Sequence, residues 1–312
     1  SVRRILASEW ERLEVLVLEA RTYPGGRVRT IRDPFDDGLY AEAGAIRFTG
    51  AHRRVLAAAR ALGLTLVPFA PASGAALTVM DGKRVRSTEP PGRAFADLAL
   101  HADERGLDPA SLLAKYTAAA PPDLARPDAP PEALAQWRSI DRTTLPGWLR
   151  AQGASAAAVA LMTLGGDASD LSALYVLRQI ALNRSASLYF KIKGGMDLLP
   201  QTMAARLKAV IRYDAPVYGV RRDARGVQVS YLEGGEARTV AAERVVFAVP
   251  FSTLRQIRMD RPFSPGKQTA VEQLGYFPGA RFLMQSSARF WRHDRLSGFA
   301  RTDQPAELWD CT

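Results

Sequence analysis

Two charged residues near the start of the chain have the type and the spacing of groups that bind an anionic, ribose-containing ligand. Glu19 ends the run of strand-forming residues 15–18. In a dinucleotide-binding βαβ unit, the acidic residue at the end of a strand accepts hydrogen bonds from ribose hydroxyls. Arg27 follows Gly25 and Gly26, whose missing Cβ atoms let the backbone approach a ligand closely. Because a guanidinium fork suits pyrophosphate oxygens, these residues predict a dinucleotide site.

The elements that must position these residues are a buried strand and a tight turn. Residues 15–18 form a continuous apolar run, which is typical of a parallel strand covered on both faces. Pro24 and the two glycines after it force a turn. No glycine precedes Gly25, and residues 1–12 have the apolar spacing of a short amphipathic helix. We therefore expect the stretch to lack the first strand and the glycine-rich phosphate turn of such a unit.

The rest of the chain alternates between strand and helix patterns. A helix is predicted over residues 51–62 with Gly63 as its stop, followed by a strand at 65–69. Asp-Gly and Gly-Gly pairs predict hairpins over 76–85 and 227–240. The other expected elements are a mostly helical region at 93–187, a strand leading through Gly194 and Gly195 into a helix, a buried strand at 245–250, a helix from 265 and a strand at 280–285.

Composition excludes several classes of protein. The 312 residues carry a net charge of +10, from 42 basic and 32 acidic residues, but no compact basic stripe with aromatic residues, so no nucleic-acid partner is predicted. The single cysteine excludes an intramolecular disulfide, and the histidines lack metal-ligand spacing, so no metal site is predicted. No apolar run approaches the length of a membrane span. We expect a soluble protein of about two domains with no membrane partner.

Three ordered segments resemble the flavin amine oxidase family, particularly its L-amino acid oxidase branch. A Gly-Gly-Met-Asp-x-Leu-Pro string and a later Pro-Val pair resemble further parts of that family. The segments that carry the resemblance are Val17-Leu18-Glu19-Ala20-Arg21, Gly25-Gly26-Arg27 with Thr30, Glu42-Ala43-Gly44-Ala45-Ile46-Arg47, Gly194-Gly195-Met196-Asp197-Leu198-Leu199-Pro200 and Pro216-Val217.

The resemblance implies an α/β fold with a discontinuous, Rossmann-like FAD-binding domain of the glutathione-reductase type, a mixed-sheet substrate domain and a helical insertion. The implied FAD-binding domain comprises residues 1–70 and 194–250 and is incomplete. The implied substrate domain comprises 71–92 and 251–312, and is also incomplete. The implied helical insertion comprises 93–193. Its aromatic residues Trp148 and Tyr175, and Tyr189 beside them, face a substrate or pack in the core, and helical spacing favours the core.

The resemblance also implies roles for individual residues. Arg47 corresponds to the residue that binds the substrate carboxylate, and the alternative is an ion pair with Glu42 or another nearby acid. Arg281 stands where many amine oxidases have a lysine that holds a water beside the flavin, and the alternative is an arginine that extends from the end of a strand. The implied FAD-binding residues are Glu19, Ala20, Arg21, Gly26, Arg27, Gly44, Ala45, Ile46, Arg47 and Val217.

The implied activity is FAD-dependent oxidative deamination of an L-amino acid to an imine and 2-oxo acid, with O2 reduced to hydrogen peroxide. One alternative is oxidation of simple amines or polyamines. Another is a catalytically silent fragment or subunit. The implied partners are an amino acid or amine and O2, with a homodimer or a companion chain that supplies further segments. The compartment stays open between cytoplasm and, if a signal has been removed, secretion.

Overall fold

The structure is a computed structural model that describes residues 14–69, 73–121, 124, 126, 129–165, 171–184, 188–207, 210–276, 279–304 and 307–311. The helix predicted over residues 1–12 lies outside these residues. The chain divides into two compact units, each built from separate segments. The first unit comprises Ser1–Ile31, Glu42–Ala45 and Gly194–Leu283, and the second comprises Arg32–Ala41, Ile46–Lys193 and Met284–Thr312.

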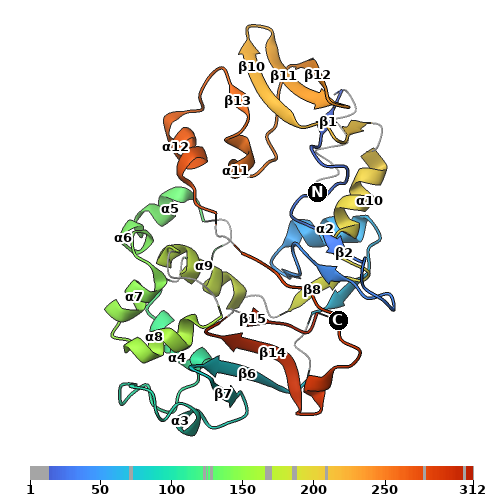
Figure 1. Ribbon diagram of the computed structural model, residues 1–312. Helices are drawn as coiled ribbons and strands as arrows, with labels where there is room; N and C mark the ends of the chain where they lie inside the picture. Colours follow the sequence, from blue (N-terminus) through green and yellow to red (C-terminus); the bar gives the residue numbers. More distant parts are fainter. Residues whose placement is uncertain are drawn as a thin grey trace. The chain divides into compact units, whose positions relative to one another are not determined.

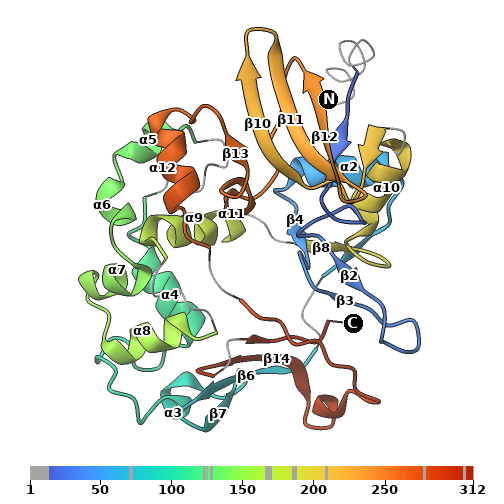
Figure 2. The same cartoon turned by 45° about the horizontal axis from the view of Figure 1, so that its top comes forward.

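The main sheet of the first unit has the strand order β12-β11-β10-β13. Its members are β10 (Val217–Asp223), β11 (Gly226–Glu233), β12 (Glu236–Ala242) and the short β13 (Arg258–Met259). Strands β10, β11 and β12 run antiparallel and side by side (Figures 1 and 2), whereas β13 pairs with β10 in parallel. The predicted hairpin over 227–240 is confirmed, and its turn uses Gly234 and Gly235 at φ 58° and 83°, a region that glycine enters without steric cost.

Three helices complete the described part of the first unit: α10 (Leu198–Leu207), α11 (Phe251–Leu254) and α12 (Pro265–Gln273). The Gly-Gly turn before α10 and the helix from residue 265 are confirmed. The proline at the first position of α12 suits a helix start, because its missing N–H has no intrahelical partner there. The core of this unit is a small apolar cluster of Val220, Val229, Leu254, Ile257 and Val271.

Three strand predictions in the first unit and its border need correction. Strand β1 (Val17–Leu18) pairs in parallel with β9 (Ile211–Arg212), but Val17 is 39% exposed, so the predicted strand exists and its predicted burial is wrong. Residues 245–250 and 280–285 do not form strands. Val246 is 86% and Phe282 is 82% exposed. An apolar run becomes a strand only where a neighbour satisfies its backbone N–H and C=O groups, and these two segments have no ladder among the described residues.

The second unit contains two sheets. One has the order β15-β14-β6-β7, from β6 (Ala75–Met80), β7 (Lys83–Arg86), β14 (Leu296–Thr302) and β15 (Glu307–Leu308). The other has the order β4-β8-β5, from β4 (Phe48–Thr49), β5 (Leu66–Pro68) and β8 (Tyr189–Ile192). The predicted hairpin over 76–85 is confirmed, with Asp81 and Gly82 at φ 50° and 75° in its turn.

The helices of the second unit confirm the predicted helical character of the region after residue 93. The helix predicted from residue 51 is α2 (Arg53–Ala61), and it stops before Gly63 at φ 73°. The others, teal to yellow-green in Figure 1, pack around the fully buried Leu112, Leu149 and Leu161. They are α3 (Pro91–Ala94), α4 (Pro109–Thr117), α5 (Pro131–Ala135), α6 (Arg138–Asp141), α7 (Leu145–Ala151), α8 (Ala156–Thr163) and α9 (Ala173–Arg184), and a short 3-10 helix, η4 (Phe290–Arg292), precedes β14.

Candidate functional site

Glu19 lies directly after β1, and backbone hydrogen bonds tie it to the segment that leads into β10. The Glu19 N–H donates to the carbonyl of Arg212 over 2.9 Å, and the Glu19 carbonyl accepts from the N–H of Ala215 over 2.9 Å. Val217, the first residue of β10, comes two positions after Ala215. The structure thus brings the residues predicted for ribose and adenine to the same end of a strand pair, as the sequence leads one to expect.

The neighbours of Glu19 hold its carboxylate in place. Its Oε1 accepts a 2.9 Å hydrogen bond from the Arg21 N–H. The Arg21 guanidinium donates to the Tyr23 hydroxyl over 2.6 Å, and Arg29 lies over the same ring with its Cζ 5.2 Å from the centroid. Ala20, between Glu19 and Arg21 in the chain, is exposed. The short segment after β1 is therefore ordered by its own side chains.

The Gly-Gly-Arg turn closes against the segment that contains Gly44. The Val28 N–H donates to the Gly25 carbonyl over 2.8 Å, with Gly25 at φ 115° and Gly26 at φ 52°. The Arg27 carbonyl accepts from the Ala45 N–H over 3.1 Å. A Cβ on Gly44 would lie 2.0 Å from that carbonyl oxygen, so only glycine permits this approach. The Arg27 side chain is exposed.

The Glu42 carboxylate ties this segment to the turn before α10. Its Oε2 accepts from the Thr30 hydroxyl over 2.8 Å, and its Oε1 accepts from the Met196 N–H over 2.8 Å. Thr30 and Glu42 belong to the paired two-residue strands β2 (Thr30–Ile31) and β3 (Ala41–Glu42). The Glu42 charge is thus met by protein hydrogen-bond donors of the first unit.

Arg281 lies against the same segment. Its Nη1 donates to the Glu42 carbonyl and, over 2.7 Å, to the Gly44 carbonyl. The residue does not extend from the end of a strand, because residues 280–285 form none. A guanidinium stays charged throughout the accessible pH range, so Arg281 can hold backbone or water in place but cannot act as a base. Its assignment as a catalytic residue stays a prediction.

Gly44 and Ala45 belong to the first unit, whereas Ile46 and Arg47 belong to the second. In the second unit, three aromatic rings surround the Arg47 guanidinium. Its Cζ lies 5.2 Å from the centroid of Phe69, 4.9 Å from that of Tyr189 and 4.4 Å from that of Trp309. Among the described residues, no carboxylate lies within 4.0 Å of this guanidinium and no acceptor takes a hydrogen bond from it. The predicted alternative, an ion pair with a nearby acid, is therefore not found in the described part of the chain.

The sequence drew attention to only one of these three rings. Tyr189 was among the aromatic residues weighed for the substrate, whereas Phe69 and Trp309 lie at the ends of unremarkable short strands. The other two aromatic residues divide as follows: Trp148 is 7% exposed in the helical core and Tyr175 is 54% exposed. In the sequence, Phe69 and Trp309 are marked only by their position directly after a short strand. That signal is too weak to predict that their rings contact Arg47.

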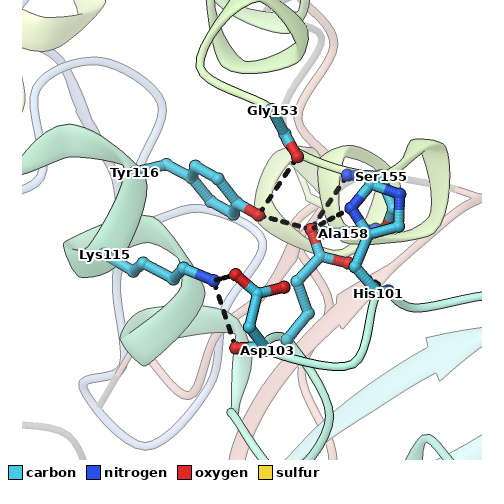
Figure 3. Close-up of polar contacts among 8 residues, drawn as sticks. His101, Asp103, Lys115, Tyr116, Gly153, Ser155 and Ala158 are labelled. Carbon is cyan, nitrogen blue, oxygen red and sulfur yellow. Dashed lines mark hydrogen bonds and ion pairs between the residues drawn. The ribbon is translucent and has the colours of Figure 1, made fainter.

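A second polar cluster lies inside the helical region, around the fully buried Glu104. Figure 3 labels Tyr116, Ser155 and His101, which belong to this cluster. Its Oε1 accepts from the Tyr116 hydroxyl over 2.6 Å and from the Ser155 N–H over 2.8 Å. Its Oε2 accepts from the His101 N–H over 2.8 Å. Nearby, Lys115 donates to Asp103 over 2.5 Å, and this hydrogen bond lowers the pKa of Asp103.

The pKa of Glu104 is set by two opposed effects. Burial raises it, but the hydrogen bonds from Ser155, Tyr116 and the His101 backbone outweigh burial and lower the pKa to about 2. Burial and the adjacent carboxylate raise the pKa of Tyr116 above its ordinary value. All donors come from backbone or from neighbouring helices, so this cluster stabilises the helical region, and no substrate role is assigned to it.

A cavity of about 390 Å³ lies in the second unit between the β6–β7 hairpin, β14 and the helices α4 and α8. Its walls are largely apolar, with Leu77, Val85, Leu161 and Phe299 among the lining side chains. Charged residues of both signs also line it: Arg86, Arg301, Glu89 and Asp108. A volume of this order accommodates a small molecule.

No described helix is long and apolar enough to cross a membrane.

Comparison with known proteins gives consistent matches along the chain. The L-amino-acid oxidase of Vipera ammodytes ammodytes is 26% identical over 305 residues, which is 95% of this chain and 61% of that protein. The L-amino-acid oxidase of Mus musculus is 26% identical over 308 residues, 95% of this chain and 47% of that protein. The chain therefore spans about half to three fifths of the length of these relatives.

Solved structures of amine oxidases share the fold. A variant of putrescine oxidase superposes with a TM-score of 0.70 at 23% identity, covering 99% of this chain and 68% of that one. Cyclohexylamine oxidase from Brevibacterium oxydans superposes with a TM-score of 0.66 at 21% identity, covering 94% of this chain and 65% of that one. They confirm the predicted mixed α/β fold with a Rossmann-like FAD domain.

The family model for flavin-containing amine oxidoreductases matches residues 5–309. That match covers the strand that ends at Glu19, the glycine turn at Arg27, the segment at Gly44 and the strand at Val217, in the order in which the sequence resemblance found them. The chain belongs to the family of flavin-containing amine oxidoreductases.

Proposed function

We propose that this protein oxidises a small amine-bearing substrate through bound FAD, and that L-amino acids are its substrate class. The observation that carries the second part is Arg47, whose guanidinium is held among aromatic rings with no carboxylate within 4.0 Å among the described residues. A charged donor group without a protein acceptor in its surroundings suits an anionic part of the substrate, and a carboxylate matches its fork of N–H groups. The relatives named L-amino-acid oxidases support the same class.

The first unit has features that fit FAD. The Glu19 carboxylate at the end of β1 would accept from ribose hydroxyls, and exposed Arg27 would pair with the pyrophosphate. Gly44 lets its segment pack closely on the Gly-Gly-Arg turn, because a Cβ there would lie 2.0 Å from the Arg27 carbonyl oxygen, and this packing holds two of the proposed FAD-binding segments together. Val217 would meet the adenine. The predicted contacts at Ala20, Arg21, Gly26, Ala45 and Ile46 belong to the same proposal.

Bound FAD would supply the acceptor for a hydride from the substrate Cα and for electron transfer to O2, and water would hydrolyse the imine product. The task of the protein is to bind the amino acid in one orientation, with its Cα hydrogen directed at the flavin. Arg47 does this by binding the carboxylate. Arg281 holds the Glu42 and Gly44 carbonyls in place and so fixes the backbone of residues 42–44.

We also propose the predicted division into FAD-binding residues 1–70 and 194–250, substrate-binding residues 71–92 and 251–312, and a helical insertion at 93–193.

Replacing Arg47 with Met tests the substrate class. Losing a charge-assisted bidentate contact removes about 1.5–3 kcal/mol of binding, so we expect KM for an L-amino acid to rise roughly 10- to 100-fold. The KM of the amine that lacks only the carboxylate should stay within about twofold of the wild type. Arg53→Met, at an exposed position of α2, is the matched control.

The same kinetic comparison separates the alternatives. An oxidase of simple amines or polyamines would show equal KM changes for both substrates in the Arg47 variant. That result would contradict carboxylate binding by Arg47. For the silent alternative, the purified chain is examined for flavin absorbance released on denaturation. A colourless sample that stays apo with added FAD would show a chain that needs a companion.

A further inference from the structure

The aromatic rings around Arg47 come from separate segments and are tied to one another. Phe69 follows β5, and its N–H donates to the Tyr189 carbonyl at the start of β8 over 2.8 Å. Trp309 follows β15, with its ring centroid 6.2 Å from that of Phe69. All three residues and Arg47 belong to the second unit. The guanidinium is therefore enclosed by a preformed group of rings and does not simply rest on one of them.

Trp309, the ring nearest to Arg47, is itself held by contacts with Glu307 and Phe299. Its indole N–H donates to Oε2 of Glu307 over 3.1 Å, while Oε1 of Glu307 accepts from Arg301 over 3.3 Å. The ring of Phe299 packs on the indole at a centroid distance of 4.6 Å. The Glu307 carboxylate thus accepts from Arg301 and from the indole, and it takes no hydrogen bond from Arg47.

This arrangement differs from that of other arginines of the same unit. Arg289 pairs with Asp310 and Arg301 pairs with Glu307, whereas Arg47 has rings in place of an acid. Aromatic faces stabilise a cation without accepting its in-plane hydrogen bonds. A second cation, Lys191, lies 5.9 Å from the centroid of Phe69. Two cations thus lie against the ring of Phe69, and the rings around Arg47 hold its guanidinium in place, which favours a planar anion.

We propose that Trp309, oriented by Glu307, is a positioning residue that sets the preference of Arg47 for a carboxylate. This inference rests on the proposed function of Arg47. The indole fixes the guanidinium plane, so that less side-chain entropy is lost when a carboxylate binds its fork. Phe299, whose ring packs on the indole, also lines the 390 Å³ cavity.

Trp309→Leu tests the role, because it keeps an apolar side chain and removes the aromatic face. Because this variant loses one cation–π contact that orients the guanidinium, we expect KM for an L-amino acid to rise about tenfold. Neither kcat nor the KM of the matching amine should change more than about twofold. Trp309→Phe retains a ring and should restore most of the affinity, which loss of packing alone would not predict.

Calorimetric titration with benzoate gives a readout that does not depend on turnover, and neutral benzamide is its uncharged comparison. The wild type should prefer benzoate, Trp309→Leu should lose about tenfold of that preference, and Glu307→Ala should lose a smaller part because only the support of the indole is removed. Phe290→Leu, at a 66% exposed aromatic position of the same unit, should match the wild type. Circular dichroism and the unfolding midpoint identify a variant that has lost its fold. If Trp309→Leu does not fold, the benzoate preference of Glu307→Ala tests the proposal.

The outcomes separate the two proposals. Benzoate binding that depends on Arg47 and Trp309, without amino-acid turnover, supports the inference and contradicts the proposed function. Amino-acid turnover that depends on Arg47, with unchanged benzoate binding in both Trp309→Leu and Glu307→Ala, overturns the inference alone. A wild type that does not prefer benzoate to benzamide also overturns it.

Discussion

At the scale of single residues, the segment around Gly44 depends on close backbone contacts. Gly44 is the tightest case, because a Cβ there would meet the Arg27 carbonyl oxygen at 2.0 Å and the Arg29 nitrogen at 2.9 Å. Both neighbours are backbone atoms, so neither can rotate away. The glycine thus lets residues 43–45 pair with 27–29, through hydrogen bonds of 2.9–3.2 Å.

Gly44→Ala should therefore force the two segments apart. We expect a loss of about 1–3 kcal/mol in the free energy of unfolding, as for other overpacked sites, together with lower flavin occupancy. Gly50→Ala is the matched control, since nothing lies within 4 Å of a Cβ built there. Urea unfolding and the flavin-to-protein absorbance ratio measure the two effects. Equal behaviour of the two variants would contradict the role of Gly44.

At the scale of elements, the helical region is held by an ionised carboxylate inside it. Glu104 receives donors from the loop at His101, from Tyr116 in α4 and from Ser155 at the start of α8. Ser155 also caps α8, because its Oγ accepts from the Ala158 N–H over 3.0 Å. One buried charge thus fixes the relative positions of a loop and two helices.

The pH dependence of stability follows from the lowered pKa. Glu104 has a pKa of about 2 in the folded protein against an ordinary value of 4.5, so its contribution to the free energy of unfolding is complete above pH about 4.5 and is lost as the pH falls toward 2. That contribution is on the order of 3 kcal/mol. Glu104→Gln should unfold at lower urea concentration at pH 6, and the difference from wild type should shrink as the pH falls to 3. The exposed Glu132→Gln serves as control, and a difference independent of pH would rule out an ionised Glu104.

At the scale of the whole molecule, the chain combines two units whose segments interleave along the sequence. The proposed cofactor contacts at Glu19, Arg27 and Val217 lie in the first unit, and the proposed carboxylate contact at Arg47 lies in the second. The first unit has the smaller apolar core among the described residues, so a cofactor that binds there should add noticeably to its stability.

Added FAD should raise the thermal midpoint of the apo chain. A ligand at 100 times its Kd stabilises the folded state by about 2.7 kcal/mol, which corresponds to a shift of several degrees, about 2–4 °C per kcal/mol. Glu19→Gln, which replaces the proposed ribose contact, should reduce that shift, and the exposed Glu243→Gln should not. An unchanged midpoint for the wild type at saturating FAD would contradict cofactor binding by this chain.

The sequence was sufficient to predict the family, the cofactor class, both hairpins and several helices, because these depend on local signals: Gly-Gly and Asp-Gly turns, helical spacing and the ordered motif around Glu19 and Arg27. It failed at residues 245–250 and 280–285, where apolar runs have no strand partner among the described residues. The assigned roles of the site residues stay predictions.

Only the tertiary structure showed the surroundings of Arg47. Phe69, Tyr189 and Trp309 lie far apart in the chain, and nothing in their local sequence indicates that their rings meet one guanidinium. Strand pairing brings Phe69 and Tyr189 together, since β5 and β8 are neighbours in one sheet, whereas Trp309 follows β15 of another sheet and meets Phe69 through ring packing. Motif spacing determines which residue types the chain carries toward a site, but contacts between distant segments determine whether an arginine there pairs with an acid or keeps its donors for a substrate.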